Sequence, residues 1–516
     1  MKIHLLIPAR GSLLALAVCV AVLAVSVTAP AAAADWKRAE SPRFIIYSDG
    51  DAGVLRDYTQ KLETFDRLLR AIHGLPLSDI PERKLPIYLV GNQRDIQYVR
   101  LGSGSGIQGF YAARGEDIFA VAVRTRGQDE VLLHEYVHHF MLQNFSAAYP
   151  AWLIEGYAEY FMTTDIGSTH IAVGRPDPDR VAWLATETWL PLTDVLSKRP
   201  GEFRDLEDRV LYYGQAWLIT HYFMSDPDRR KTLWAYVDAV GSGQDPVAAL
   251  EAATGMTAPA FEQALRDYFR GSTRITNYRA DLFPQVTISV SELGAAEDDL
   301  MLLSRRLIIG APQDERAATA EAVRRAAARH GRDPFARLTL ARAELVFGDK
   351  VRGVTLLEDL LEDHPENVEA LQHLASAKLT AAREDGEDGT LREAQALLAR
   401  AYALDPGQYR TYLLLARARE GAPSYPTDND LETWQLAYSL APQLTEVRVG
   451  AARALIMRDR FDEAIAILGP VANDPHGGEG AAIASQMIVM ARARQTPPEA
   501  MDEDVRAGEA EAPPAR

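Results

Sequence analysis

Five prolines recur at similar intervals in the C-terminal part of the chain, and this spacing limits what that part can fold into. Pro334, Pro365, Pro406, Pro442 and Pro475 stand 31, 41, 36 and 33 residues apart. Each proline follows one amphipathic helical pattern and precedes another. Units of this length cannot bury their apolar faces alone and must stack on one another, which predicts an all-helical repeat array.

The repeat length resembles that of tetratricopeptide (TPR) repeats, which is about 34 residues. The junction "LEDLLEDHPENVEALQHLASAKL" returns as "ARAYALDPGQYRTYLLLARAR", which favours repeats over an unrelated helical bundle. We predict a TPR-like solenoid over 312–496 and attribute the longest interval to an inserted polar loop, "REDGEDGT". Such arrays bind peptides or proteins in a concave groove. The Ala-, Glu-, Asp- and Pro-rich tail, 497–516, is predicted to be disordered.

The N-terminus has the parts of a secretory signal peptide. Lys2 and Arg10 precede an apolar run from Leu13 to Val27, and a stretch of small residues ends at Ala34. The run is short for a transmembrane span, and its alanine-rich end favours cleavage. We therefore predict a signal peptide over 1–34, cleavage near Ala34 and export to the periplasm or out of the cell. No stable membrane anchor is expected after cleavage.

Charge and cysteine usage exclude several classes of function. The net charge of -17 argues against nucleic-acid binding, which needs a basic face. The only cysteine, Cys19, lies inside the predicted signal peptide. The mature chain therefore has no thiol for catalysis or for metal binding. Any transition-metal site must use histidines and carboxylates.

The N-terminal part has strand patterns followed by helical patterns. Strand patterns cover 44–47, 85–90 and 118–123, and helical patterns cover 53–73, 128–145, 150–162, 209–224 and 228–240. This order is typical of an α+β domain, which we place at 35–270. Residues 271–311 show a mixture of sequence patterns, and we interpret them as a connector.

One helical pattern contains His134-Glu135-Tyr136-Val137-His138. Histidines four residues apart lie on one face of a helix, one turn from each other, so both imidazoles can bind one zinc ion. Glu135 is turned by about 100° around the helix axis. It would miss the metal and still reach a water beside it, as a general base does. A surface helix with two solvated histidines is the alternative.

The next helical pattern offers a third ligand. A catalytic zinc site with two histidines needs one more protein ligand and one open position. The segment "PAWLIEGYAEYF" carries Glu155 and Glu159, again four residues apart. One of them can bind the metal while the other accepts a hydrogen bond from the free N–H of a ligand histidine. Ordinary solvated carboxylates are the alternative.

Together, "HEYVHHF" and "PAWLIEGYAEYF" resemble the gluzincin metallopeptidases, the thermolysin-like and M1-aminopeptidase-like superfamily. They are most similar to the bacterial peptidase MA-like or DUF1570-type domains, which often precede TPR repeats. The resemblance covers about 36–270 and implies a thermolysin-like fold with one zinc ion per chain. By position it implies His134, His138 and Glu155 as zinc ligands, Glu135 as the base and Glu159 as the partner of a ligand histidine.

The resemblance also points to an oxyanion donor and away from exopeptidase activity. Similar domains carry a tyrosine two residues before a glutamine, which selects Tyr213, with Tyr212 as the runner-up. A core tyrosine is the alternative for either. No "GxMEN"-like motif precedes the zinc helix, and the corresponding region reads "GFYAARGEDIFAVAV". Recognition of a free N-terminus is therefore not supported.

Three functions remain open from the sequence. The first is an exported zinc endopeptidase acting on a peptide or protein, with the repeats binding the substrate or a partner. The second is a peptidase-like scaffold without turnover that acts through its repeats. The third is a zinc hydrolase of a cell-wall amide. Zinc content separates the enzymes from the scaffold, and the substrate cleaved separates the two enzymes.

Overall fold

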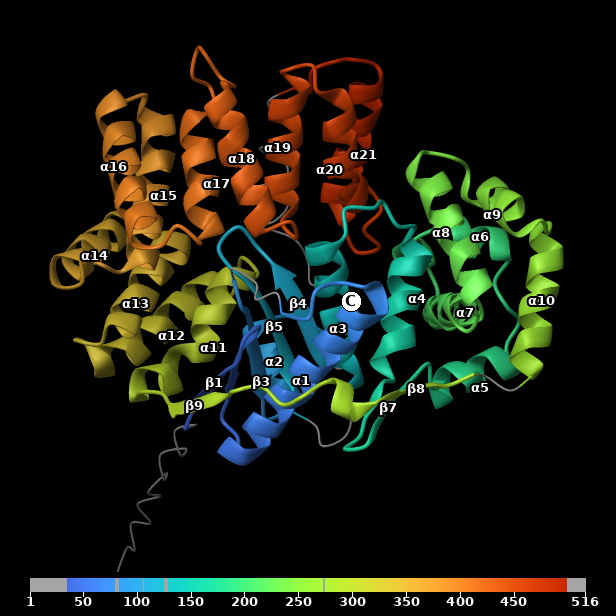
Figure 1. The fold of residues 1–516 in the computed structure, drawn as a ribbon. Helices are drawn as coiled ribbons and strands as arrows, with labels where there is room; N and C mark the ends of the chain where they lie inside the picture. The colour runs from blue at the N-terminus through green and yellow to red at the C-terminus, as the bar shows by residue number, and fades with distance from the viewer. Residues whose placement is uncertain (1–34, 79–82, 105, 125–128, 272–273, 499–516) are drawn as a thin grey trace, which may run out of the picture. The chain divides into compact units, whose positions relative to one another are not determined.

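The computed structural model describes residues 35–78, 83–104, 106–124, 129–271 and 274–498. The predicted signal peptide, 1–34, lies outside these ranges, as does the predicted tail from residue 499 onward. Within them, none of the helices is both long and apolar enough to cross a bilayer. The chain has a mixed α+β N-terminal region followed by a helical repeat region that resembles TPR repeats (Figure 1).

A six-stranded mixed sheet organises the N-terminal region. In the order β4-β5-β3-β2-β1-β9, its strands are Gly109–Ala113, Ile118–Val123, Leu85–Val90, Phe44–Ser48, Lys37–Glu40 and Ser289–Glu292. The central strands β2, β3 and β5 are parallel, whereas β4, β1 and β9 pair antiparallel. β9 comes from the predicted connector, which therefore completes this sheet.

Alternating side chains of the strands enter two separate apolar layers. Ile87 and Leu89 face the layer shared with α1 (Ala52–His73) and α3 (Glu130–Asn144). Tyr88 and Val90 face the opposite layer, shared with α2 (Gln93–Val99) and α11 (Ala295–Ile309). Both faces of β3 are buried because successive strand residues point to opposite sides.

A helical part follows α3 and surrounds a small second sheet. Its helices are α4 (Ala151–Met162), α5 (Pro178–Thr186), α6 (Leu192–Ser197), α7 (Leu206–Met224), α8 (Pro227–Gly241), α9 (Pro246–Thr254) and α10 (Ala258–Arg270). The sheet consists of β6 (Asp165–Ile166), β7 (His170–Val173) and β8 (Thr276–Arg279). Helix α4 packs along α3 on one side and along α7 on the other, which places α4 at the centre of this part.

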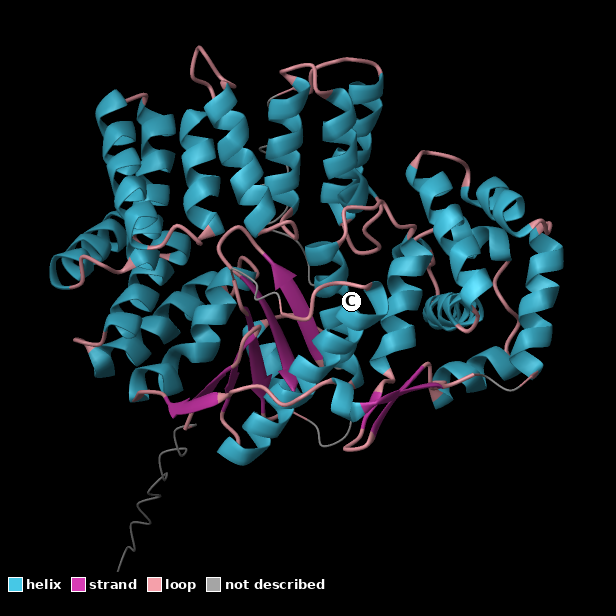
Figure 2. Cartoon of the chain, in the orientation of Figure 1, coloured by secondary structure: helices cyan, strands magenta, loops and turns pink. Residues whose placement is uncertain are grey.

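Beyond β9 the described chain consists of helices and loops (Figure 2). The helices after α11 are α12 (Arg316–Ala327), α13 (Pro334–Phe347), α14 (Lys350–Asp363), α15 (Val368–Asp385), α16 (Asp388–Leu404), α17 (Tyr409–Arg419), α18 (Asp428–Leu440), α19 (Thr445–Ile456), α20 (Phe461–Ala472) and α21 (Gly478–Arg492). Pro334 begins α13, and the other four spaced prolines lie in the turns before α15, α17, α19 and α21. The helix junctions predicted at the prolines are thus confirmed.

The interval of 41 residues has a different cause from the one expected. The segment "REDGEDGT" does not form a polar loop, because α15 continues to Asp385 and α16 begins at Asp388. These helices have 18 and 17 residues, against 14 each for α13 and α14. Gly386, with a φ of 69°, makes the tight turn between them. The extra residues therefore lengthen one helical hairpin.

The repeat region and the N-terminal region share a hydrophobic core. Tyr409, Leu413, Leu444 and Val447 belong to the same buried cluster as the sheet and α3. They come from α17, the turn before α19 and α19 itself. The repeats are therefore packed against the N-terminal region by apolar burial, the main favourable term in such contacts.

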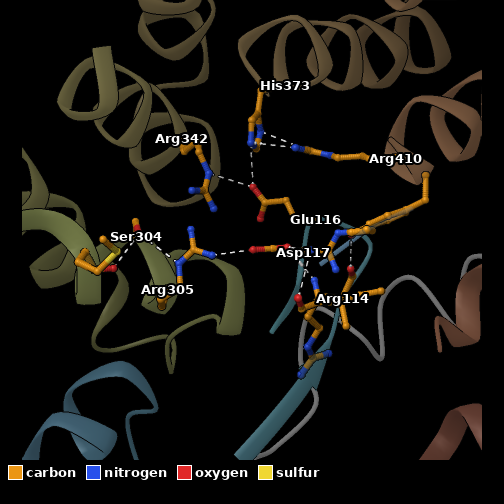
Figure 3. A network of polar contacts seen from close by, with 12 residues as sticks. Arg114, Glu116, Asp117, Ser304, Arg305, Arg342, His373 and Arg410 are labelled. Carbon is orange, nitrogen blue, oxygen red and sulfur yellow. Dashed lines mark hydrogen bonds and ion pairs between the residues drawn. The ribbon is translucent and has the colours of Figure 1, made fainter. Parts of the chain in front are cut away.

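The β4–β5 hairpin adds polar contacts to this packing (Figure 3). The side chain of Glu116 at the hairpin tip accepts from Arg342 Nε at 3.0 Å and lies 3.1 Å from His373 Nε2. Arg305 Nη1 donates to Asp117 at 2.7 Å. Burial alone would raise the pKa of Glu116, but Arg342 and Arg410 hold it below the ordinary value. The repeat face formed by α13, α15 and α17 is thus partly occupied by the chain's own hairpin.

Candidate metal centre

Helix α3 carries the HEYVH residues and is fixed in place by its buried face. Val137 and Phe140 enter the main core. Tyr136 donates its hydroxyl to Asp66 of α1 at 2.7 Å. Asp66 in turn pairs with two buried arginines, Arg43 at 2.6 Å and Arg70 at 2.9 Å. These contacts set the rotation of α3 and direct the side chains of its opposite face toward α4.

The three predicted ligands meet between α3 and α4. The Nε2 atoms of His134 and His138 are 3.0 Å apart. Glu155 Oε2 lies 3.4 Å from His134 Nε2 and 3.7 Å from His138 Nε2. Ligand atoms of a tetrahedral zinc ion are separated by about 3.3 Å, given bonds of about 2.0–2.1 Å. These residues therefore form a group that could hold a metal ion.

The burial and hydrogen bonding of Glu155 give an independent test of whether these residues can hold a metal ion. Its side chain is 0% exposed, and among the described residues neither carboxylate oxygen has a well-aligned hydrogen bond. A buried carboxylate without such partners is strongly unfavourable unless a cation compensates it. Burial alone would raise the pKa of Glu155, but nearby imidazoles hold it well below the ordinary value. An ionised, fully buried carboxylate whose Oε2 faces two imidazole nitrogens fits a divalent cation.

The protonation of the histidines agrees with metal binding. Burial lowers the pKa of His138 to about 3, so its imidazole is neutral. Neutral imidazole is the form that binds a metal. Burial also lowers the pKa of His134, but the carboxylates of Glu155, Glu159 and Glu135 outweigh it and raise the pKa. A cation in the site would displace the His134 proton on binding, because the ligand nitrogen must be free.

Glu135 lies beside the ligand group without joining it. Its carboxylate is outside the cluster of ligand atoms formed by the two histidines and Glu155. Burial raises the pKa of Glu135, against the lowering effect of His134 and His476. A carboxyl group with a raised pKa is a better proton acceptor than an ordinary one.

Glu159 has a partner that the sequence did not indicate. Its Oε1 is 3.7 Å from His134 Nδ1, which is longer than a hydrogen bond. Arg180 of α5 instead binds both oxygens, at 2.8 Å through Nε and 3.0 Å through Nη2. Glu159 is thus held in place by Arg180 and stands close to His134 without bonding it. Nothing in the sequence around Arg180 signalled this contact, because it depends on how α5 folds back.

The structure distinguishes the two candidate tyrosines. Tyr212 is fully buried, and its hydroxyl donates to the carbonyl of Lys198 at 3.1 Å. Tyr213 is partly exposed, and the Arg180 guanidinium lies 5.5 Å from its ring centroid. Burial and the carboxylates of Glu155 and Glu159 raise the pKa of Tyr213. Tyr213 therefore stays protonated beside the site and can donate, whereas Tyr212 is a core residue.

Gly156 explains how α7, which carries Tyr213, comes so close to α4. A Cβ at this position would lie 2.3 Å from the carbonyl oxygen of Ala216 and 2.4 Å from Thr220 Oγ1. Only a glycine allows this approach of the two helices. Gly156, which directly follows the candidate ligand Glu155, is therefore required by the packing of α4 on α7.

We expect Gly156→Ala to destabilise the protein by about 1–3 kcal/mol, because the added methyl forces α4 and α7 apart. The displacement should also weaken zinc binding through Glu155. Urea unfolding and a chelator competition would measure the two effects. Gly389→Ala is the matched control, since Gly389 lies in α16 with nothing within 4 Å of an added Cβ. An unchanged unfolding midpoint for Gly156→Ala would contradict the packing argument.

Comparison with known proteins adds one family and a set of repeat structures. A family described as "Protein of unknown function (DUF1570)" matches residues 130–248. This range runs from α3 into α9 and contains His134, Glu135, His138, Glu155 and Tyr213. His476, discussed below, lies outside it. The chain therefore contains a DUF1570 domain, whose description assigns no activity.

Several solved structures are similar to part of the chain. A thermophilic TPR protein from Thermus thermophilus, TTC0263, is 19% identical over 38% of this chain and 99% of its own, with a TM-score of 0.33. MamA AMB-1 is 19% identical over 33% of this chain and 88% of its own, with a TM-score of 0.24. No curated protein shows significant similarity to the chain.

Proposed function

We propose that the chain is an exported zinc metallopeptidase with a thermolysin-like arrangement of its site, acting as an endopeptidase. The observation that carries the proposal is the group of His134, His138 and the fully buried Glu155, with Glu135 next to His134 in the chain. Three protein ligands with a fourth position open are typical of catalytic zinc, whereas structural zinc sites are closed by four.

Each residue has a distinct part in peptide hydrolysis. A zinc ion bound at the site supplies Lewis acidity, which polarises the scissile carbonyl and acidifies water. Glu135 takes the proton from the attacking water and passes it to the leaving amine. Tyr213 donates its hydroxyl hydrogen to the oxygen on which negative charge develops. Arg180 holds Glu159 next to His134, so the carboxylate of Glu159 keeps a fixed position beside that ligand.

A scaffold without turnover is the second candidate. TPR-like repeats are interaction modules, which favours a role in binding a protein partner. The hairpin tip argues against a partner on the α13–α15–α17 face, because Glu116 already contacts Arg342 and His373 of that face. A partner would have to use another face or displace the hairpin.

Digestion of an unbiased peptide library by wild-type protein and by Glu135→Gln tests the proposal. Zinc-dependent internal cleavage by the wild type alone would support an endopeptidase. Release of N-terminal residues only would contradict the endopeptidase assignment. Cleavage of cell-wall peptide amides in the absence of library cleavage would favour the third function, a cell-wall amidase. No cleavage of either substrate by zinc-loaded protein would favour the scaffold.

A further inference from the structure

The turn between α20 and α21 brings a third histidine to the metal centre. His476 Nε2 lies 2.9 Å from Glu155 Oε1, although His476 belongs to the last repeat hairpin and Glu155 to α4. The imidazole is 38% exposed, whereas the Glu155 side chain is fully buried. His476 therefore stands at the boundary between the buried ligand group and solvent.

The turn is held against the N-terminal region just before His476. Asn473 Nδ2 donates to the carbonyl of Ala148 at 3.1 Å, just before α4. The guanidinium of Arg199 donates to the carbonyl of Ala472. Within the turn, the backbone N–H of His476 donates to Asp474 Oδ1 at 2.8 Å, which sets the local conformation. The imidazole is thus presented by an anchored backbone.

The two oxygens of Glu155 face different histidines. Oε2 is the atom that lies within 3.4 Å and 3.7 Å of the His134 and His138 nitrogens. Oε1 is the atom next to His476. His476 lies outside the group of ligand atoms that are all within 4.8 Å of one another. The arrangement separates a metal-facing oxygen from an oxygen bound by the repeat region.

We propose that His476 is a positioning residue of the metal centre, supplied by the repeat region. Its Nε2–H would hydrogen-bond Glu155 Oε1 and so hold the carboxylate with Oε2 toward the metal. The inference rests on the proposed zinc site and extends it, because metal affinity then depends on docking of the α20–α21 turn. Partners of this kind orient metal ligands, and losing one typically costs about 10- to 100-fold in affinity.

Because docking of the turn and zinc binding affect each other equally, the proposed role of His476 has a second consequence. If docking of the turn strengthens zinc binding by some factor, zinc binding must strengthen docking by the same factor. Backbone amides at 472–478 should therefore exchange more slowly with deuterium when zinc is bound. The protection should disappear in a variant that lacks the His476 side chain, even when zinc is saturating.

The test uses the full chain with zinc as the probe. We expect His476→Ala to weaken zinc binding by roughly 10- to 100-fold in a chelator competition. His476→Gln should recover most of it, because its Nε2 can donate from a similar position. His364→Ala is the matched control, since His364 lies in the equivalent turn before α15 and its imidazole is 3.7 Å from nearby Glu366. Equal unfolding midpoints in chelator would show that the variants fold alike.

Three outcomes would overturn the inference. Wild-type zinc affinity in His476→Ala would remove the positioning role and leave the zinc site standing. A change of coordination number in the cobalt-substituted spectrum of His476→Ala would make His476 a ligand instead. No zinc binding by the wild type would remove the proposed function and this inference together, so the two failures are distinguishable.

Discussion

Replacing Glu135 with glutamine is expected to reduce peptide hydrolysis by about 10²- to 10⁴-fold while zinc stays bound. Glutamine keeps the size of the side chain but cannot accept the proton of the attacking water. The loss corresponds to about 3–5 kcal/mol of barrier. Zinc should stay because the ligand atoms come from His134, His138 and Glu155 and not from Glu135.

The measurement pairs the turnover number on an internal-cleavage peptide with zinc content per chain. Glu130→Gln serves as a control, because Glu130 begins the same helix and lies outside the ligand group. Full activity of Glu135→Gln would contradict the role as base. Loss of zinc in the same variant would instead place Glu135 among the ligands.

Replacing Glu155 with glutamine should lower stability in the absence of zinc and lower it further in its presence. Without metal, the nearby imidazoles hold the pKa of the Glu155 carboxyl well below its ordinary value, so the ionised side chain stabilises the fold. Neutral glutamine loses this contribution, and the variant should unfold at lower urea than the wild type in chelator. With zinc at about 1,000 times its Kd, the wild type gains about 4 kcal/mol. The variant should lose most of this gain.

Urea unfolding in chelator and in excess zinc, with metal analysis at about one zinc per wild-type chain, checks this prediction. Glu63→Gln is the matched control. Glu63 is also fully buried, and its carboxylate accepts the backbone N–H of Arg43 at 2.8 Å, away from the ligand group. Its effect on stability should be the same in chelator and in zinc. A Glu155→Gln variant that loses the same stability in chelator and in zinc would argue against a metal held by Glu155 at this site.

The repeat region is not a separate module, because it contacts the N-terminal region at several places. Tyr409 and Leu413 share the core of the N-terminal region. Glu116 at the hairpin tip contacts the repeat residues Arg342 and His373, and His476 reaches Glu155. The connector also contributes β9 to the main sheet. An activity of the N-terminal region is therefore expected to depend on the presence of the repeats.

The sequence by itself determined what local spacing controls. His134 and His138 had to share a helix face, because an α-helix repeats every 3.6 residues. The prolines at the repeat junctions had to lie between helices or at a helix start, because proline lacks the N–H that a position inside a helix donates. Glu155 and Glu159 could be singled out by their four-residue spacing, and the choice of Glu155 as the ligand came from the family resemblance. These inferences needed no knowledge of how distant segments meet.

Only the tertiary structure decided which distant side chains complete the site. Arg180 binds Glu159 because α5 packs against α7, the neighbour of α4, and no local pattern encodes that contact. His476 meets Glu155 because the whole repeat region packs against the N-terminal region. Tyr213 could be separated from Tyr212 only by which one faces the core. Contacts of this kind depend on the packing of many elements at once, whereas helix periodicity depends on neighbours in the chain.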